Sequence, residues 1–110
     1  MSILQTEKID IVATKPNSSE VKLVVSDHLD WSDVVGHFSL LQDKINTYIA
    51  FVESGQLERT KQPHMPVNPN VTIVLAVSRE PTQEAMRLLG EVKVFLASIN
   101  IDFALEVHGS

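Results

Sequence analysis

The sequence predicts an α+β fold, an α/β two-layer sandwich in which two helices cover one face of a four-stranded mixed sheet. Three observations support this fold class. Short segments carry the apolar patterns of strands, two longer segments repeat apolar residues every three or four positions, and each helical segment is followed by a strand. The predicted order is therefore ββαβαβ in a single domain, 1–110, with an N-terminal arm at 1–7 and a proline-rich loop at 56–70.

The first two strands are predicted to form a hairpin. Residues 8–14 alternate, with Ile9, Ile11 and Ala13 on one side. The run Pro16-Asn17-Ser18-Ser19 is a dense turn signal, and a second strand follows over residues 21–25. Because the connection is short and polar, we expect the two strands to pair in an antiparallel sense.

A helix is predicted from Ser32 to about Ser54. Its apolar residues recur at spacings of three and four, which stacks them on one face: Val34, Phe38, Leu41, Ile45, Tyr48 and Val52. Leu40 and Phe51 fall outside this stripe, so the apolar surface is wider than one contact requires. Gly55 accepts the left-handed conformation that ends a helix.

Residues 56–70 are predicted to form an extended surface loop without helix or inner strand. Pro63, Pro66 and Pro69 remove backbone donors and fix φ at every third position. The near-continuous apolar run that follows, over residues 71–77, is typical of a central strand covered on at least part of both faces.

Pro81 is predicted to open a second helix, since proline is favoured at the first helical position. The buried stripe of this helix comprises Ala85, Leu88, Leu89, Val92, Leu96 and Ile99. Gly90 interrupts the helix at a typical cost of ~1 kcal/mol relative to alanine, which would allow close packing. Asn100 can serve as the left-handed cap, and residues 101–108 alternate as a last strand.

The final strand–helix–strand unit is expected to be a right-handed crossover between parallel strands. The sequence does not determine the order of the strands in the sheet. Each helix has one main apolar stripe, which suits packing on a single sheet face. The other face would then be open, with apolar side chains from Val12, Val24, Val74 and Ala76.

Composition and charge exclude several function classes. The net charge is −5, with nine basic residues scattered among fourteen acidic ones, so we expect no nucleic-acid partner. No apolar run approaches the ~20 residues that cross a bilayer, and we expect no membrane association. Cysteine is absent, which excludes disulfides, thiolate metal sites and cysteine nucleophiles. The N-terminus lacks a signal-peptide pattern, so we expect a cytoplasmic protein.

The densest group of polar residues lies at 26–33, where a strand gives way to the first helix. The candidate ligand or partner site consists of Asp27, His28, Asp30, Trp31 and Asp33. The simplest interpretation is structural. Asp30 would be the helix N-cap, with Asp33 three residues later as its capping-box partner, and both carboxylates would face the positive end of the helix dipole.

A metal site is the second interpretation of this junction. Its ligands would come from Asp27, His28, Asp30 and Asp33, with His37 one turn further along the helix. Carboxylate and imidazole suit zinc, manganese or iron. However, no HExxH or Cys/His framework is present, and adjacent strand residues point to opposite faces. We therefore predict no metal site here.

A catalytic role is the third interpretation, with His28 as a general base oriented by Asp27 or Asp30. The sequence contains no GxSxG elbow, no GxGxxG motif and no Walker-type loop. We therefore predict no catalytic residues and no cofactor, and the sequence favours a non-enzymatic protein. His37, His64 and His108 are interpreted as exposed or loop histidines.

The segment 21–57 resembles a family of small uncharacterised, mostly bacterial proteins. The resemblance rests on Val24-Val25-Ser26-Asp27-His28-Leu29-Asp30-Trp31 and on Leu40-Leu41-Gln42-Asp43-Lys44-Ile45-Asn46-Thr47-Tyr48-Ile49-Ala50-Phe51-Val52-Glu53-Ser54-Gly55-Gln56-Leu57. It covers about a third of the chain specifically and the rest more loosely. It implies a bacterial cytoplasmic protein of unknown function and transfers no functional residues.

Two functions from different classes follow. The first is a small cytoplasmic interaction module without enzymatic activity that self-associates, as a dimer, and could bind another protein. The surplus apolar residues of the first helix and of the open sheet face would supply its contact surface. The alternative is a small-molecule or metal-binding protein that uses the junction.

Overall fold

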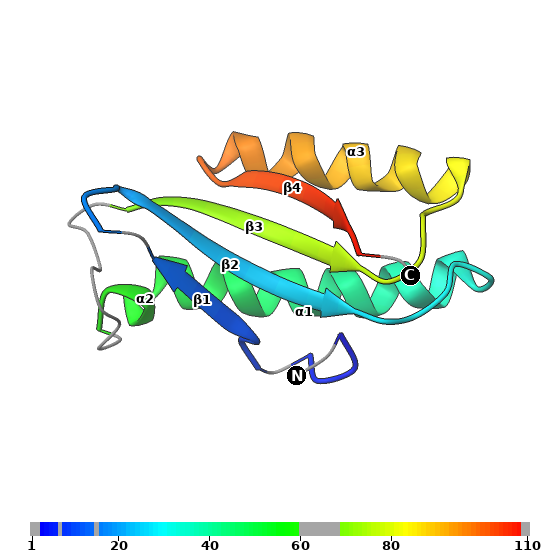
Figure 1. The fold of residues 1–110 in the computed structure, drawn as a ribbon, viewed down its shortest axis with the longest axis horizontal. Coiled ribbons are helices and arrows are strands. Elements are labelled where there is room, and N and C mark those ends of the chain that lie inside the picture. Colours follow the sequence, from blue (N-terminus) through cyan, green and yellow to red (C-terminus); the bar gives the residue numbers. More distant parts are fainter. Residues whose placement is uncertain (1–2, 7, 15, 60–68, 109–110) are drawn as a thin grey trace.

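The computed structural model describes residues 3–6, 8–14, 16–59 and 69–108. Its elements are β1 (Ile11–Thr14), β2 (Glu20–Asp27), α1 (Val34–Glu53), α2 (Gln56–Arg59), β3 (Asn70–Val77), α3 (Gln83–Ser98) and β4 (Asp102–Val107). The predicted ββαβαβ order is confirmed, with the short helix α2 in addition (Figure 1).

The sheet is four-stranded and mixed, in the order β1-β2-β3-β4. β1 pairs with β2 in an antiparallel sense, whereas β2–β3 and β3–β4 are parallel. The register places Val12, Leu23, Ile73 and Phe103 in one row across the four strands. The strand order that the sequence left open is thus sequential, and each parallel connection runs through a long helix.

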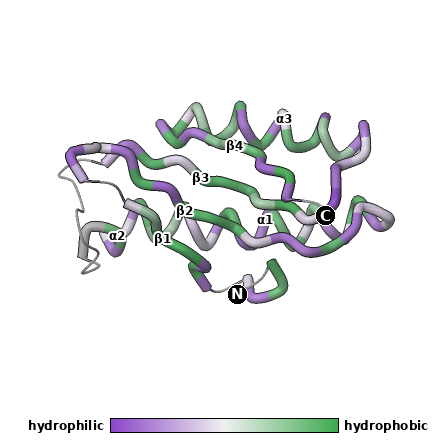
Figure 2. Tube along the Cα trace, in the orientation of Figure 1, coloured by the Kyte–Doolittle hydropathy of each residue, from purple (hydrophilic) through white to green (hydrophobic). Residues whose placement is uncertain are grey.

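Both long helices cover the same face of the sheet. The side chains that alternate inward from β2 and β3 form one buried cluster with residues of α1 and α3: Leu23, Val25, Ile73 and Leu75 from the strands, and Leu41, Tyr48, Leu89 and Leu96 from the helices. β3 is hydrophobic along most of its length, as a central strand should be (Figure 2). The two-layer sandwich predicted from the sequence is therefore the observed fold.

The second face of the sheet carries no helix among the described residues. Its central row is Ile11, Val24, Val74 and Ala104. Val74, in this row, is 2 % exposed although it lies outside the core cluster. Val12 was expected on this face, but it pairs with Leu23 and packs against the core, so that expectation is wrong.

The C-terminal caps of the long helices agree with prediction, whereas the start of α3 does not. Gly55 and Asn100 have φ values of 80° and 63°, the left-handed region that ends a helix. Thr82 is the N-cap of α3, and its hydroxyl accepts a hydrogen bond of 3.2 Å from the Ala85 amide. Pro81 therefore precedes the cap instead of opening the helix.

Three further expectations need correction. Residues 56–59 form the helix α2, because the prolines begin only at residue 63 and Leu57 is anchored in the core. Residues 60–68 of the predicted loop lie outside the described residues. Leu40 and Phe51 are half-buried against the core and are not a free surface. A Cβ at Gly90 would meet no atom of the described residues within 4 Å, so no packing among those residues requires this glycine.

Candidate functional site

The junction between β2 and α1 is built around a buried carboxylate. Asp27 is the last residue of β2 and continues the inward alternation of Val21, Leu23 and Val25. Its side chain therefore points into the helix layer, where it is 1 % exposed. One carboxylate oxygen accepts the Leu29 amide at 3.1 Å, which closes the turn that follows the strand.

His37 is the partner of this carboxylate. Its Nε2 lies 2.5 Å from Oδ2 of Asp27, and its Nδ1 lies 2.9 Å from the carbonyl oxygen of Asp30. A carbonyl oxygen only accepts, so Nδ1 carries a proton. Nε2 and Oδ2 of Asp27 form the second hydrogen bond of the ring. The expectation that His37 is exposed is wrong. The residue is only 3 % exposed, because its position in α1 faces the sheet.

Trp31 covers the imidazole of His37. The two ring centroids are 3.7 Å apart and the planes are inclined by 14°, a stacked arrangement. The indole Nε1 donates a hydrogen bond of 3.0 Å to the carbonyl of Arg79, in the loop after β3. Trp31 thus links the segment that follows β2 to the segment that follows β3 and covers one face of the His37 ring.

Asp30 and Asp33 have roles different from those predicted. Asp33 is the N-cap of α1, and its Oδ1 accepts the Gly36 amide at 3.0 Å. A Cβ at position 36 would collide with this carboxylate, which explains the glycine. Asp30 instead accepts the amide and hydroxyl of Ser32, and these hydrogen bonds, aided by the charge of Arg79, lower the pKa of Asp30. The prediction of Asp30 as N-cap is wrong.

In the described part of the junction, the buried polar side-chain atoms all have hydrogen-bond partners within the chain. Both ring nitrogens of His37 and both oxygens of Asp27 have hydrogen-bond partners. No buried side-chain nitrogen or oxygen in the described residues lacks one. Within the same residues, no group of three or more His, Cys, Asp or Glu could hold a metal ion. His28 is exposed and shares no hydrogen bond with Asp27. This geometry suits a structural role, in which the Asp27–His37 pair joins β2 to α1, better than it suits general-base chemistry.

A second buried polar cluster fastens the N-terminal segment to α1. Lys44 is fully buried, and its Nζ donates to Oδ1 of Asp10 and to the carbonyl of Gln5, each at 2.7 Å. Asp10 also accepts the Ser26 amide at 3.0 Å, so its carboxylate replaces a strand partner at the edge of β2. The Tyr48 hydroxyl donates to the Val24 carbonyl and accepts the Asp10 amide. Burial raises the pKa of Tyr48.

Comparison with known proteins relates the whole chain to one family. The model of a family of unknown function, DUF6572, matches residues 1–109. The chain belongs to this family. No curated protein and no solved structure matches it. Membership of DUF6572 agrees with the resemblance seen in segment 21–57 and assigns no activity.

Asp27 was among the predicted site residues of this DUF6572 member, but its pairing with His37 and the whole Lys44 cluster were missed in the sequence, although a signal was present. His37 and Lys44 fall on the same helical face as Leu41 and Tyr48, at spacings of three and four. A charged or titratable residue on a buried stripe needs a buried partner. Asp27, at an inward position at the end of β2, is the carboxylate that this rule assigns to His37. His108 is exposed as predicted, and His64 lies outside the described residues.

Proposed function

We propose that the protein is a cytoplasmic, non-enzymatic interaction module that self-associates as a dimer. One observation carries this proposal. Of the seven large apolar side chains that are exposed in the described residues, four belong to the last two elements, α3 and β4. They are Met86, Val94, Phe95 and Val107, with 47, 72, 56 and 50 % of their surface exposed. Apolar surface concentrated at one end of a sheet is typical of a protein contact.

The state of the junction supports a role without catalysis. A general base or a metal ligand needs a lone pair that a substrate or ion can reach. In the Asp27–His37 pair, the carboxylate oxygen and the ring nitrogen hydrogen-bond to each other, which joins β2 to α1, and Trp31 stacks on the ring.

No helix in the described part of the chain has the length and apolar composition of a membrane span. The resemblance noted in the sequence supports a bacterial cytoplasmic origin.

The mass of the purified protein in solution tests the proposal. We expect light scattering coupled to size exclusion to give twice the chain mass of 12.2 kDa at micromolar concentrations, falling towards the monomer on dilution. The expected driving force is burial of the exposed apolar side chains, at roughly 25 cal/mol per Å². A monomer mass at every concentration up to the millimolar range would contradict self-association.

A ligand-binding role at the junction is the alternative. A shallow depression of about 330 Å³ lies beside His37, lined by Leu4, Leu29, Asp30, Asp33, Gly36, His37 and Leu40. A small molecule with an apolar body and a cationic group would complement this leucine and aspartate lining. Elemental analysis and mass spectrometry of protein purified without a histidine tag would favour this alternative if a stoichiometric ion or molecule remained bound.

A further inference from the structure

We propose that two copies of the chain join through β4, side by side and antiparallel, so that their two sheets become one and Leu105 of each copy lies at the two-fold axis. This inference rests on the proposed self-association and identifies its contact surface and register. Edge-to-edge pairing of this kind gives the closed, isologous contact that is usual for homodimers.

β4 is an edge strand that has no lysine, proline or inward-pointing charge to oppose pairing. It is the last strand of the sheet, and no strand among the described residues covers its outer side (Figure 1). Its sequence, residues 102–107, contains no lysine, arginine or proline, and both of its acidic residues lie on the open face. Natural edge strands are normally blunted by such residues or kept very short. The opposite edge, β1, has only four residues and ends close to Pro16.

The hydrogen bonds between β3 and β4 show which backbone N–H and C=O groups of β4 point outward and could pair with a second copy. The His108 amide donates to the Val77 carbonyl of β3 at 2.8 Å. In a parallel pair, the N–H and C=O of alternate residues point towards the neighbouring strand and those of the residues between point away. Even-numbered residues of β4 therefore bond to β3. The outward groups belong to Phe103, Leu105 and Val107, a row of three donors and three acceptors.

Pairing must also keep like faces together. Phe103 and Leu105 lie on the helix face, and Ala104 and Glu106 on the open face. In an antiparallel pair, residues directly opposite each other share a face. Two registers near the strand centre satisfy this condition, one with Ala104 opposite its own copy and one with Leu105 opposite its own copy.

Charge distinguishes the two registers. With Ala104 on the axis, Asp102 of one copy lies opposite Glu106 of the other, and like charges directly opposed are destabilising. With Leu105 on the axis, Asp102 lies opposite His108. The His108 Nε2 lies 3.1 Å from Oε1 of Glu106 in its own chain, and in the dimer the imidazole can donate a hydrogen bond to the Asp102 carboxylate instead. This register also sets Phe103 opposite Val107, so the half-exposed valine gains an aromatic partner. The Leu105 register is therefore preferred.

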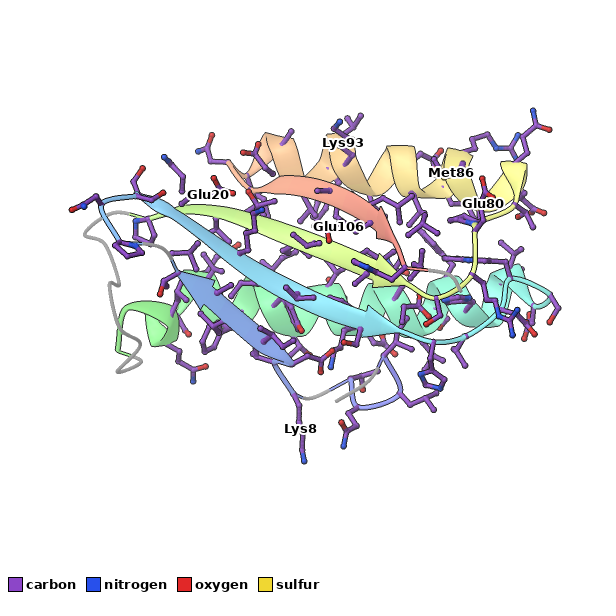
Figure 3. The ribbon with its side chains drawn as sticks, viewed as in Figure 1. Lys8, Glu20, Glu80, Met86, Lys93 and Glu106 are labelled. Carbon is purple, nitrogen blue, oxygen red and sulfur yellow. The ribbon has the colours of Figure 1, made fainter. Side chains whose placement is uncertain are left out.

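The flank of α3 nearest this edge is compatible with a second copy. Phe95 and Glu91 line the groove towards α1, so the opposite flank of α3 consists of Met86, Gly90, Lys93 and Ala97. Figure 3 shows Met86 and Lys93 on α3 above β4, which carries Glu106. Gly90 lies near the middle of α3, and a Cβ there would meet no atom of the described residues within 4 Å. In the proposed dimer, α3 of the second copy would pack closely against α3 at Gly90. Such a contact would explain a glycine that the packing of a single copy does not require.

Cysteine cross-linking tests the register, because the natural chain has no cysteine. In the Leu105 register, residue 104 of one copy and residue 106 of the other form a non-hydrogen-bonded pair, with Cα atoms about 4.5 Å apart, within disulfide range. We expect Ala104→Cys and Glu106→Cys proteins to form a disulfide-linked dimer when mixed and oxidised, whereas neither links alone. Linking of Ala104→Cys alone would overturn the proposed register.

Proline at position 107 tests the edge itself. The Val107 N–H points outward, so Val107→Pro removes no hydrogen bond to β3, but it removes a donor to the second copy and places a ring against it. We expect the dimer dissociation constant to rise at least about tenfold, with an unchanged circular dichroism spectrum. The control Val35→Ser, at an exposed position near the start of α1, should leave the constant unchanged.

The outcomes separate the two proposals. A native monomer at all concentrations would refute self-association. A native dimer that is insensitive to Val107→Pro and gives no mixed disulfide would refute the β4 contact alone. Weakening by Phe95→Ser instead of Val107→Pro would place the contact in the groove between α1 and α3 and would likewise overturn the edge proposal.

Discussion

Replacing Lys44 with methionine is expected to lower the free energy of unfolding by about 3–5 kcal/mol, the usual cost of removing one partner of a buried ion pair. Both side chains of the Lys44–Asp10 pair are fully buried. Methionine has a similar volume, so the loss comes from the Asp10 carboxylate, which would keep the Ser26 amide but lose its cation. The N-terminal segment would also lose its anchor at the Gln5 carbonyl.

Urea unfolding measures this effect as a lower midpoint at an unchanged slope. The matched control is the double variant Lys44→Met/Asp10→Asn, in which no unpaired charge remains and an oxygen is still available to the Ser26 amide. We expect the double variant to be more stable than Lys44→Met. Equal stability of native protein and Lys44→Met would show that the pair contributes nothing.

Replacing His37 with leucine is expected to have a similarly large effect, again about 3–5 kcal/mol. The Asp27 carboxylate would stay buried and keep its hydrogen bond from the Leu29 amide, but it would lose the imidazole. The Asp30 carbonyl would lose its donor, and Trp31 would lose the ring on which it stacks. The folded variant should therefore differ from the native protein in tryptophan fluorescence, because Trp31 is the only tryptophan of the chain.

His28→Ala is the matched control for this variant. His28 belongs to the same junction but is exposed, so its replacement should change stability by no more than about 0.5 kcal/mol. If His28→Ala were the more damaging of the two substitutions, the assignment of His37 as the partner of Asp27 would be wrong.

Much of the fold could be predicted from periodicity alone. The stripes of α1 and α3, the apolar run of β3 and the two left-handed caps follow from local physics, and the structure confirms them. The error at Val12 has a different cause. A strand with apolar residues on both sides does not reveal which side faces the helices, and only its pairing with Leu23 assigns the face.

The junction could be predicted only in part. The sequence indicated a capped helix start after a strand, but Asp30 and Asp33 are both chemically suitable caps, and the turn closed by Asp27 and Asp30 sets the helix start later than predicted. The partnership of Asp27 with His37 spans ten residues and depends on α1 folding back over β2. Local sequence rules do not report such a contact, although the inward position of each residue does.

Amide hydrogen exchange followed by NMR at two protein concentrations tests the central claim, self-association through β4, most directly. We predict that the outward amides of Phe103, Leu105 and Val107 exchange slowly in concentrated protein and rapidly after dilution, while those of Ala104 and Glu106, which face β3, stay protected at both concentrations. Rapid exchange of the three outward amides at every concentration, in a sample that light scattering shows to be dimeric, would contradict the claim.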